Sequence, residues 1–189
     1  MSGANDRSAA TPHERLRDLR RVRQYRQFTD EPPSPEEMDA IVDAARWTGS
    51  SRNEQPWRFV VIRDIGTIRR IGEMGLPQTR ALPTATAAIA IIVPDDPSRE
   101  VMRAYDEGRV AERMLIAASM LGLGGGITWI RKDVLPAARE ILELPDDLLV
   151  RTIVALGHPT EAARLPRLPR GQARLPRDQT VFHDRWPRD

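Results

Sequence analysis

The chain carries Ser50-Ser51-Arg52-Asn53-Glu54-Gln55-Pro56-Trp57 between two strongly patterned stretches. The small polar side chains and the proline of this segment favour an irregular loop. The run that follows, from Trp57 to Ile62, is rich in aromatic and β-branched residues, and this composition predicts a buried strand. The loop therefore leads directly into the core of the expected fold.

A helix is predicted immediately before this loop. Ser34 can act as its N-cap, Pro35 suits the first helical position, and Glu36 and Glu37 suit the positive end of the helix dipole. Four residues at helical spacing give the segment one apolar face: Met38, Ile41, Val42 and Ala45. These signals predict a helix over residues 34–48 that ends at Gly49.

Four further stretches have helical features. Apolar residues spaced by three predict an amphipathic helix that begins at Pro12 and carries the basic residues 20–26 at its end. Asp64 can cap a short helix through Ile71, and Asp133 can start another that ends near residue 144. The longest helix is expected over residues 98–121. Its buried face is expected to include six residues: Val101, Tyr105, Met114, Leu115, Ala118 and Leu121.

Further strands are expected over residues 87–93, 127–130 and 150–156, where short apolar runs are bounded by turn residues. After Pro159 the composition changes to arginine, proline and leucine without periodicity, which predicts an extended arm. The sequence therefore predicts an α+β fold in three parts: a flexible lead over residues 1–11, one domain over residues 12–159 and an arm over residues 160–189.

Composition narrows the possible chemistry. The 189 residues include no cysteine, which excludes disulfides, thiolate-bound zinc and a thiol nucleophile, so redox chemistry would need a cofactor. Lys132 is the sole lysine, and the other cationic residues are arginines, which suit phosphate or carboxylate ligands. The first residues do not resemble a signal peptide, and the longest apolar run, residues 87–93, is too short to span a membrane. We therefore expect a cytoplasmic protein that does not associate with membranes.

The strongest cluster of charge is formed by Arg20, Arg21, Arg23 and Arg26. On a continuous helix, Arg23 and Arg26 would share one face and could reach a single phosphate. A solvated basic helix and a nucleic-acid patch are the alternatives. Few aromatic residues interleave with these arginines and the net charge of the chain is only +2, so nucleic-acid binding is not expected.

Other familiar site patterns are missing from the sequence. The glycines at 122–126 lie between a predicted helix and a predicted strand, the reverse of a dinucleotide fingerprint, so they favour a helix end and a tight turn, or a backbone that lies against a flat ligand. The three histidines lack metal-ligand spacing, and no Gly-x-Ser-x-Gly motif occurs. We expect neither a metal site nor a catalytic serine.

Two motifs resemble those of the nitroreductase family. Residues 23–30, Arg-Gln-Tyr-Arg-Gln-Phe-Thr-Asp, are similar to the family's opening Arg-Ser-x-Arg-x-Phe, and residues 50–57 are similar to its more specific Ser-Ser-x-Asn-x-Gln-Pro-Trp loop. Later landmarks follow in order, with Leu-Gly-Leu-Gly at 121–124, Trp-Ile at 129–130, Leu-Pro at 144–145 and Leu-Gly-x-Pro at 156–159. The similarity extends over nearly the whole chain.

The resemblance implies a nitroreductase-like fold: a central, mostly antiparallel sheet of about four to five strands flanked by helices, with the C-terminal arm exchanged in a homodimer. It implies FMN as the cofactor and NADH or NADPH as the electron donor. A hydride would pass through flavin N5 to a nitroaromatic, a quinone or a similar small acceptor by a ping-pong mechanism. No side chain is expected to act as a catalytic acid or base.

The resemblance also assigns residues to the phosphate end of the cofactor. Arg23, Gln24 and Arg26 would hold the FMN phosphate and ribityl chain, and Arg174 of the arm would be a second phosphate ligand. Gln24 departs from the family pattern, which usually has serine at this position.

The flavin ring is assigned to other segments. Ser50, Ser51, Asn53 and Gln55 belong to a loop that would meet the flavin from the partner subunit. The backbone amides of Ile127 and Thr128 would face the edge of the isoalloxazine.

One further position departs from the family. Many members have a lysine between residues 75 and 86, whereas this chain has none there, and Arg80 would take its place near flavin N1.

Two alternatives stay open on the sequence. The first is another activity of the same fold, in which the flavin itself is consumed or a halogen is removed from a tyrosine derivative. The second is a protein without enzymatic activity that binds nucleic acid or a partner through its arginine-rich segments.

Overall fold

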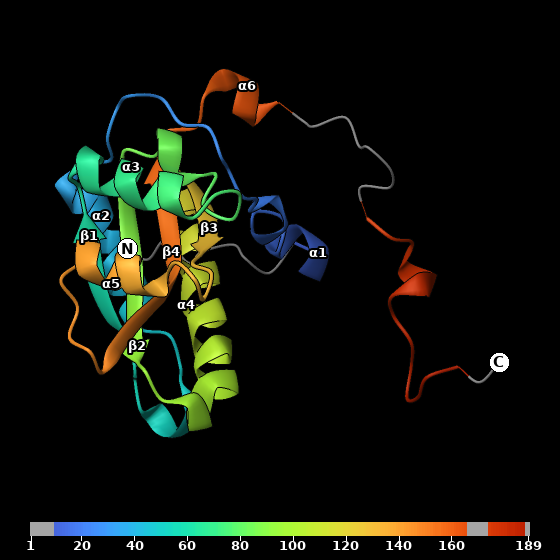
Figure 1. Ribbon diagram of the computed structural model, residues 1–189. Helices are drawn as coiled ribbons and strands as arrows, with labels where there is room; N and C mark the ends of the chain where they lie inside the picture. The colour runs from blue at the N-terminus through green and yellow to red at the C-terminus, as the bar shows by residue number, and fades with distance from the viewer. Residues whose placement is uncertain (1–9, 166–173, 188–189) are drawn as a thin grey trace, which may run out of the picture.

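The computed structural model describes residues 10–165 and 174–187 (Figure 1). Its centre is an antiparallel sheet of four strands, β1 (Arg58–Ile62), β2 (Ala87–Pro94), β3 (Gly124–Trp129) and β4 (Leu148–Gly157). The strand order is β1-β2-β4-β3, so β1 and β3 form opposite edges. The predicted α+β class with a mostly antiparallel sheet is confirmed.

Helices cover both faces of this sheet. On one face lie α2 (Pro35–Arg46) and α4 (Glu100–Met120), and on the other lie α3 (Ile65–Met74) and α5 (Leu135–Ile141). Strand β2 supplies both cores because its side chains alternate, with Ile89 and Ile91 facing α2 and α4, and Ala90 and Ile92 facing α3 and α5.

Short elements connect these layers. Two four-residue helices, α1 (Pro12–Arg15) and α6 (Glu161–Arg164), lie near the ends of the described domain. Five single turns of 3₁₀-helix complete the description: η1 (Leu19–Arg21), η2 (Ser51–Asn53), η3 (Leu82–Thr84), η4 (Pro97–Arg99) and η5 (Arg177–Gln179).

The start of α2 agrees with the prediction in detail. The Oγ of Ser34 accepts a hydrogen bond from the Glu37 amide at 3.1 Å, and the Glu37 carboxylate accepts one from the Ser34 amide at 2.7 Å. Helix α3 begins in a similar way, because the Asp64 carboxylate accepts from the Thr67 amide at 2.6 Å. Helix α2 ends earlier than expected, with Trp47 rather than Gly49 following its last turn.

The helix predicted from Pro12 to residue 26 is wrong. Helix α1 ends at Arg15 and η1 ends at Arg21, after which Gln24 forms a parallel bridge to Gly125 of β3. The Tyr25 amide donates to the Gly125 carbonyl at 2.8 Å, a tertiary hydrogen bond that a helix would forgo. Arg23 and Arg26 therefore lie on an extended segment and do not share a helix face.

The buried face of α4 was predicted only in part. Met114, Leu115 and Ala118 are buried, but Val101 and Tyr105 are 70% and 73% exposed, and Leu121 is exposed as well. The same helical stripe continues toward the N-terminus through charged residues that the prediction left out: Arg103, Asp106 and Glu107. The apolar residues at 101 and 105 consequently lie on the outer side of the helix.

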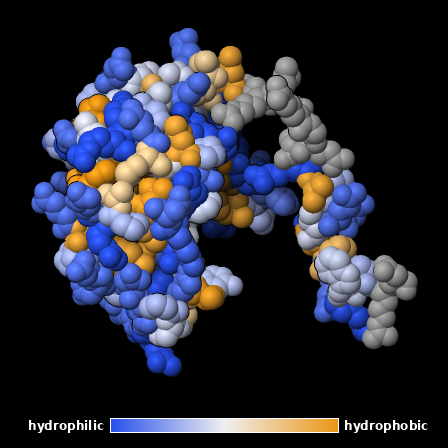
Figure 2. Space-filling view, viewed as in Figure 1, coloured by the Kyte–Doolittle hydropathy of each residue, from blue (hydrophilic) through white to orange (hydrophobic). Residues whose placement is uncertain are grey.

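Strand β1 was expected to be buried and is only half so. It forms an edge of the sheet, with Arg58 and Val61 exposed and Ile62 buried. Beyond the described domain, residues 174–187 are all exposed, including four apolar ones: Leu175, Val181, Phe182 and Trp186. Figure 2 shows orange apolar atoms on this separate segment. Whether it packs on a partner subunit stays a prediction.

Glu107 supplies a test of the α4–β4 packing. It is 2% exposed, its Oε2 accepts from the Thr152 hydroxyl at 2.7 Å, and its Oε1 has no hydrogen-bond partner among the described residues. Burial raises the pKa of Glu107 above its ordinary value of 4.5, so the folded state favours the protonated carboxyl.

Because the pKa of Glu107 is raised in the folded state, its contribution to the free energy of unfolding decreases as the pH rises above 4.5. Glu107→Gln removes the titration, so we expect the free energy of unfolding of the variant, relative to wild type, to increase between about pH 4.5 and about pH 8. Urea unfolding of the variant and of the wild type at the two pH values measures this difference in free energy. A relative stability that is independent of pH would contradict burial as the cause.

Candidate cofactor site

A cavity opens beside the edge strand β3. It is lined by nine residues and has a volume of about 470 Å³. The lining comes from the segment after η1, the loop after α3, and β3: Gln24, Arg26, Pro77, Gln78, Arg80, Ala81, Ile127, Thr128 and Trp129. Five of the eleven residues predicted for the cofactor site therefore meet around one cavity.

Backbone and side-chain hydrogen bonds hold one wall of this cavity. The Ile127 amide donates to Gln24 Oε1 at 3.1 Å, and the Thr84 hydroxyl donates to the Arg26 carbonyl at 3.2 Å. Thr128 is buried, and its hydroxyl donates to the Ile153 carbonyl at 2.8 Å. The extended segment 24–26 is thus fixed to β3, and the amide of Ile127 is engaged by a side chain of the protein itself.

The glycines before Ile127 make this approach possible. A Cβ at Gly126 would collide with the carbonyl oxygen of Tyr25, and one at Gly124 would lie 2.6 Å from Cγ of Pro159. Gly122, with φ of 76°, ends α4 as predicted, whereas Gly124 begins strand β3 instead of continuing a loop. The close neighbour of these glycines is the protein's own chain.

The charged residues that line the cavity are all positive. Arg26 and Arg80 line it, and no carboxylate is among its lining residues, all of which belong to the described part of the chain. A guanidinium keeps its proton at all physiological pH values and can form paired hydrogen bonds to phosphate. The cavity therefore favours an anionic ligand.

Arg23 lies outside the lining of this cavity. Its guanidinium lies over the Tyr25 ring, 4.9 Å from the centroid, and its Nε donates to the Tyr25 hydroxyl at 3.0 Å. Its Nη2 donates to the carbonyls of Ala163, at 3.1 Å, and Arg164. Arg23 thus binds the C-terminal end of α6, which ties the first residues of the predicted arm to the same chain.

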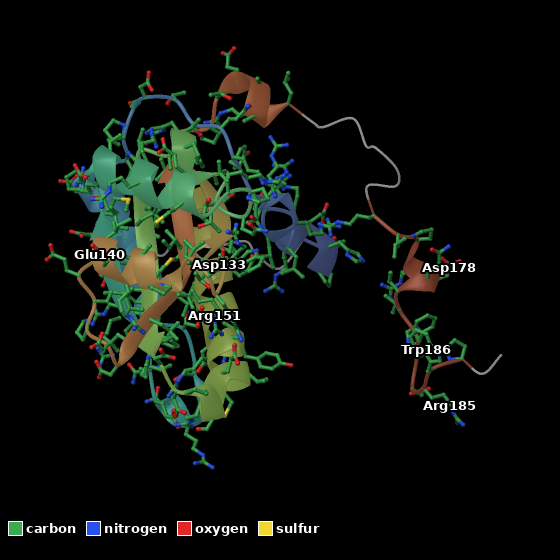
Figure 3. All side chains as sticks on the ribbon, in the orientation of Figure 1. Asp133, Glu140, Arg151, Asp178, Arg185 and Trp186 are labelled. Atoms are coloured by element: carbon green, nitrogen blue, oxygen red, sulfur yellow. The ribbon has the colours of Figure 1, made fainter. Side chains whose placement is uncertain are left out.

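Arg174 is not brought to the cavity by the described contacts. It lies in the exposed segment 174–187 and is not among the residues that line the cavity. In Figure 3, Arg185 and Trp186 of this segment lie well apart from Arg151 and Asp133 of the domain.

The loop that carries Ser50, Ser51, Asn53 and Gln55 lies elsewhere. It leads into β1, at the edge of the sheet opposite to β3, and it lies beside the start of α4 (Figure 1). The Gln55 amide donates to the Ser50 Oγ at 2.8 Å across the loop. Within one chain, the loop and the cavity are therefore separate.

Four cavity residues were not predicted as site residues: Pro77, Gln78, Ala81 and Trp129. Trp129, 51% exposed at the end of β3, was noticed only as a landmark, and its strand position beside Ile127 could have placed it. Gln78 lies in the loop after α3 and gave no sequence signal. Among the described residues, no group of three acidic or histidine side chains is arranged to hold a metal ion, and no helix is long and apolar enough to cross a membrane.

Comparison with known proteins relates this geometry to a family. Residues 19–90, which include both the cavity segment 24–26 and the loop 50–57, match the model of the nitroreductase family. A candidate NADH dehydrogenase/NAD(P)H nitroreductase of Archaeoglobus fulgidus is 32% identical over 145 residues, which cover 74% of this chain and 82% of that protein. The chain belongs to the nitroreductase family.

Two further relatives extend the comparison. An FMN reductase [NAD(P)H] of Bacillus subtilis is 28% identical over 180 residues, covering 83% of this chain and 71% of that protein. The crystal structure of a candidate NADH dehydrogenase/NAD(P)H nitroreductase from Parabacteroides distasonis superposes with a TM-score of 0.75 at 25% identity, over 90% of this chain and 98% of that one. The predicted nitroreductase-like fold is thereby confirmed.

Gly126 tests the link between β3 and the segment 24–26. Gly126→Ala should displace the Tyr25 backbone and destabilise the fold by about 2 kcal/mol, the usual size of a small overpacking defect. Gly108→Ala, where a Cβ would meet nothing within 4 Å in the middle of α4, should instead stabilise the fold. Thermal unfolding of the two variants measures the difference, and equal midpoints would contradict the close approach.

Proposed function

We propose that the protein is an FMN-dependent oxidoreductase that uses NADH or NADPH to reduce a small acceptor. The observation that carries the proposal is the cavity at β3, with two arginines and no carboxylate among its lining residues, in a member of the nitroreductase family. The relative of Bacillus subtilis named as an FMN reductase [NAD(P)H] supports the choice of cofactor and donor.

The cavity fits FMN in size and chemistry. Its volume of about 470 Å³ lies within the range of about 300–1,000 Å³ that is common for small-molecule sites. Arg26 offers a cation for the phosphate, and Pro77, Ala81 and Trp129 offer apolar surface for a flat ring. Arg80 would place a second positive charge beside the ring, where it favours the anionic reduced form.

The chemistry divides between cofactor and protein. Bound FMN would supply hydride transfer through N5, from the nicotinamide donor to the acceptor. The residues of this chain would bind the phosphate, orient the ring on the β3 edge and keep one face open, with no side chain acting as acid or base. Donor and acceptor would occupy that open face in turn, as in a ping-pong mechanism, and the acceptor would be a nitroaromatic, a quinone or a similar compound.

The same proposal includes a homodimer. The loop with Ser51 and Asn53 cannot reach the cavity of its own chain, so a second subunit would have to supply it. Helix α4 offers a surface for that subunit, because Val101, Tyr105 and Met120 are each at least 70% exposed on it. The arm that contains Arg174, whose described residues 174–187 are all exposed, would pack on the partner and bring Arg174 to its phosphate site.

The first experiment is an absorbance spectrum of the purified protein, followed by anaerobic addition of NADH or NADPH. We expect a flavin band that bleaches with at least one of the two nucleotides, because FMN would be bound and reducible. Protein that is colourless and takes up no added FMN would overturn the proposal. Salt-sensitive retention of such a colourless protein on DNA would favour the nucleic-acid alternative instead.

Binding of FMN and of riboflavin can distinguish the roles of the two cavity arginines. Arg26→Gln should weaken FMN binding about tenfold to a hundredfold, the cost of one charge-assisted hydrogen bond, and leave riboflavin binding unchanged because riboflavin lacks the phosphate. Arg80→Gln should weaken both ligands, since Arg80 is assigned to the ring.

Fluorescence titration of each variant measures these dissociation constants. Arg70→Gln, on the exposed side of α3 and away from the cavity lining, is the matched control and should bind both ligands as wild type does. Equal losses of FMN and riboflavin affinity in Arg26→Gln would show that Arg26 does not bind the phosphate.

A further inference from the structure

We propose that Glu54 is a positioning residue that fixes the Ser50–Gln55 loop to the junction of η4 and α4. Its Oε1 lies 2.7 Å from Nη2 of Arg99, and its Oε2 lies 3.3 Å from Nη1 of Arg103. Each carboxylate oxygen therefore has its own guanidinium partner. Arg99 ends η4 and is the N-cap residue of α4, and Arg103 lies in the first turns of this helix, so the carboxylate binds both sides of the η4–α4 junction.

The backbone of the loop needs such a support. Arg52, Asn53 and Gln55 have φ values of 51°, 56° and 46°, in the left-handed region that non-glycine residues rarely adopt. Glu54, between them, has φ of −67°. Conformations of this kind persist only where surrounding contacts hold them in place. The Glu54 carboxylate provides such contacts, to residues far from the loop in the sequence.

The environment of these ion pairs makes them stronger than ordinary surface pairs. The side chains of Arg103, Glu54 and Arg99 are 9%, 25% and 30% exposed, whereas the Asp43–Arg46 pair on α2 is about two-thirds exposed on both sides. Partly buried charges are screened less by solvent and salt. The hydrogen bond from Arg99 lowers the pKa of Glu54, so the carboxylate stays ionised at neutral pH.

The position of the pairs on α4 gives them a functional consequence, which rests on the proposed function. Val101 and Tyr105, on the outer side of the same two helical turns, belong to the surface that we assign to the partner subunit. The loop and that surface are therefore held by one rigid helix. Glu54 would fix where Ser51 and Asn53 stand relative to the cavity of the partner.

The first test uses the protein without cofactor. Glu54→Gln should release the loop, and trypsin should then cleave after Arg52, an exposed residue of the loop, at least several-fold faster than in wild type. Mass spectrometry identifies the fragment that ends at residue 52. Glu100→Gln is the matched control. It removes the same charge near the start of α4, but Glu100 pairs with Arg151 at 3.3 Å and Lys132 at 3.9 Å and not with the loop.

The second test uses FMN. Glu54→Gln and Arg99→Gln should each raise the dissociation constant for FMN about tenfold, and the double variant should be no worse than Glu54→Gln alone, because that variant already lacks the pair with Arg99. The thermal midpoints of Glu54→Gln and Glu100→Gln should agree within about 2 °C, since the effect is on the loop and not on global stability.

The outcomes separate this inference from the proposed function. Fast cleavage after Arg52 together with weaker FMN binding, in Glu54→Gln alone of the two glutamate variants, supports the positioning role. Wild-type cleavage and wild-type FMN affinity in Glu54→Gln overturn it and leave the flavoenzyme intact. A wild-type protein that binds no FMN overturns the proposed function, while the cleavage comparison still decides whether Glu54 holds the loop.

Discussion

The pairing of residues 24 and 25 with the edge of β3 is the contact on which the candidate site depends. It places Gln24 and Arg26 beside Ile127 and Trp129, and it closes one wall of the cavity. Only a strand without side chains at positions 124 and 126 allows the approach, because a Cβ there would meet Pro159 or the Tyr25 carbonyl. The glycines that resemble a nucleotide-binding loop thus serve the packing of protein on protein.

Helix α4 organises the other half of the molecule. Its inner side packs Met114 and Leu115 into the sheet, its N-cap Arg99 and its residue Arg103 hold Glu54, and its outer side leaves Tyr105 exposed. A single helix therefore joins the hydrophobic core, a conformationally unusual loop and an apolar surface. The charged face of this helix is buried because its residues meet partners there, Arg103 with Glu54 and Glu107 with Thr152.

Local signals predicted the parts of the fold that depend on local chemistry. The caps at Ser34 and Asp64 were correct because each is made by neighbours in sequence. The prediction of a helix that continues to residue 26 was wrong, because pairing with a strand about 100 residues later in the sequence overrides the apolar spacing there. The buried face of α4 was predicted only in part, because Arg103 is buried beside a partner from another segment, Glu54. The spacing of apolar residues in a sequence gives no information about such tertiary partners.

The residues of the candidate site could be predicted from the sequence only where they belong to recognisable motifs. Gln24, Arg26 and Ile127 meet at the cavity as the resemblance implies, although the distance between them in sequence is large. The separation of Asn53 from that cavity follows from strand order, which no single motif encodes. Gln78 had no signal at all, since a lone glutamine in an irregular segment has no pattern to distinguish it.

The use of arginine at both charged positions of the cavity fixes its electrostatics against changes in acidity. A lysine placed in a partly dehydrated site titrates readily, so its charge would depend on its surroundings. Arg26 and Arg80 both line the cavity, and the lining includes no carboxylate. Because a guanidinium is not deprotonated in proteins, the positive charge that these two side chains present to an anionic ligand is independent of pH wherever the fold persists.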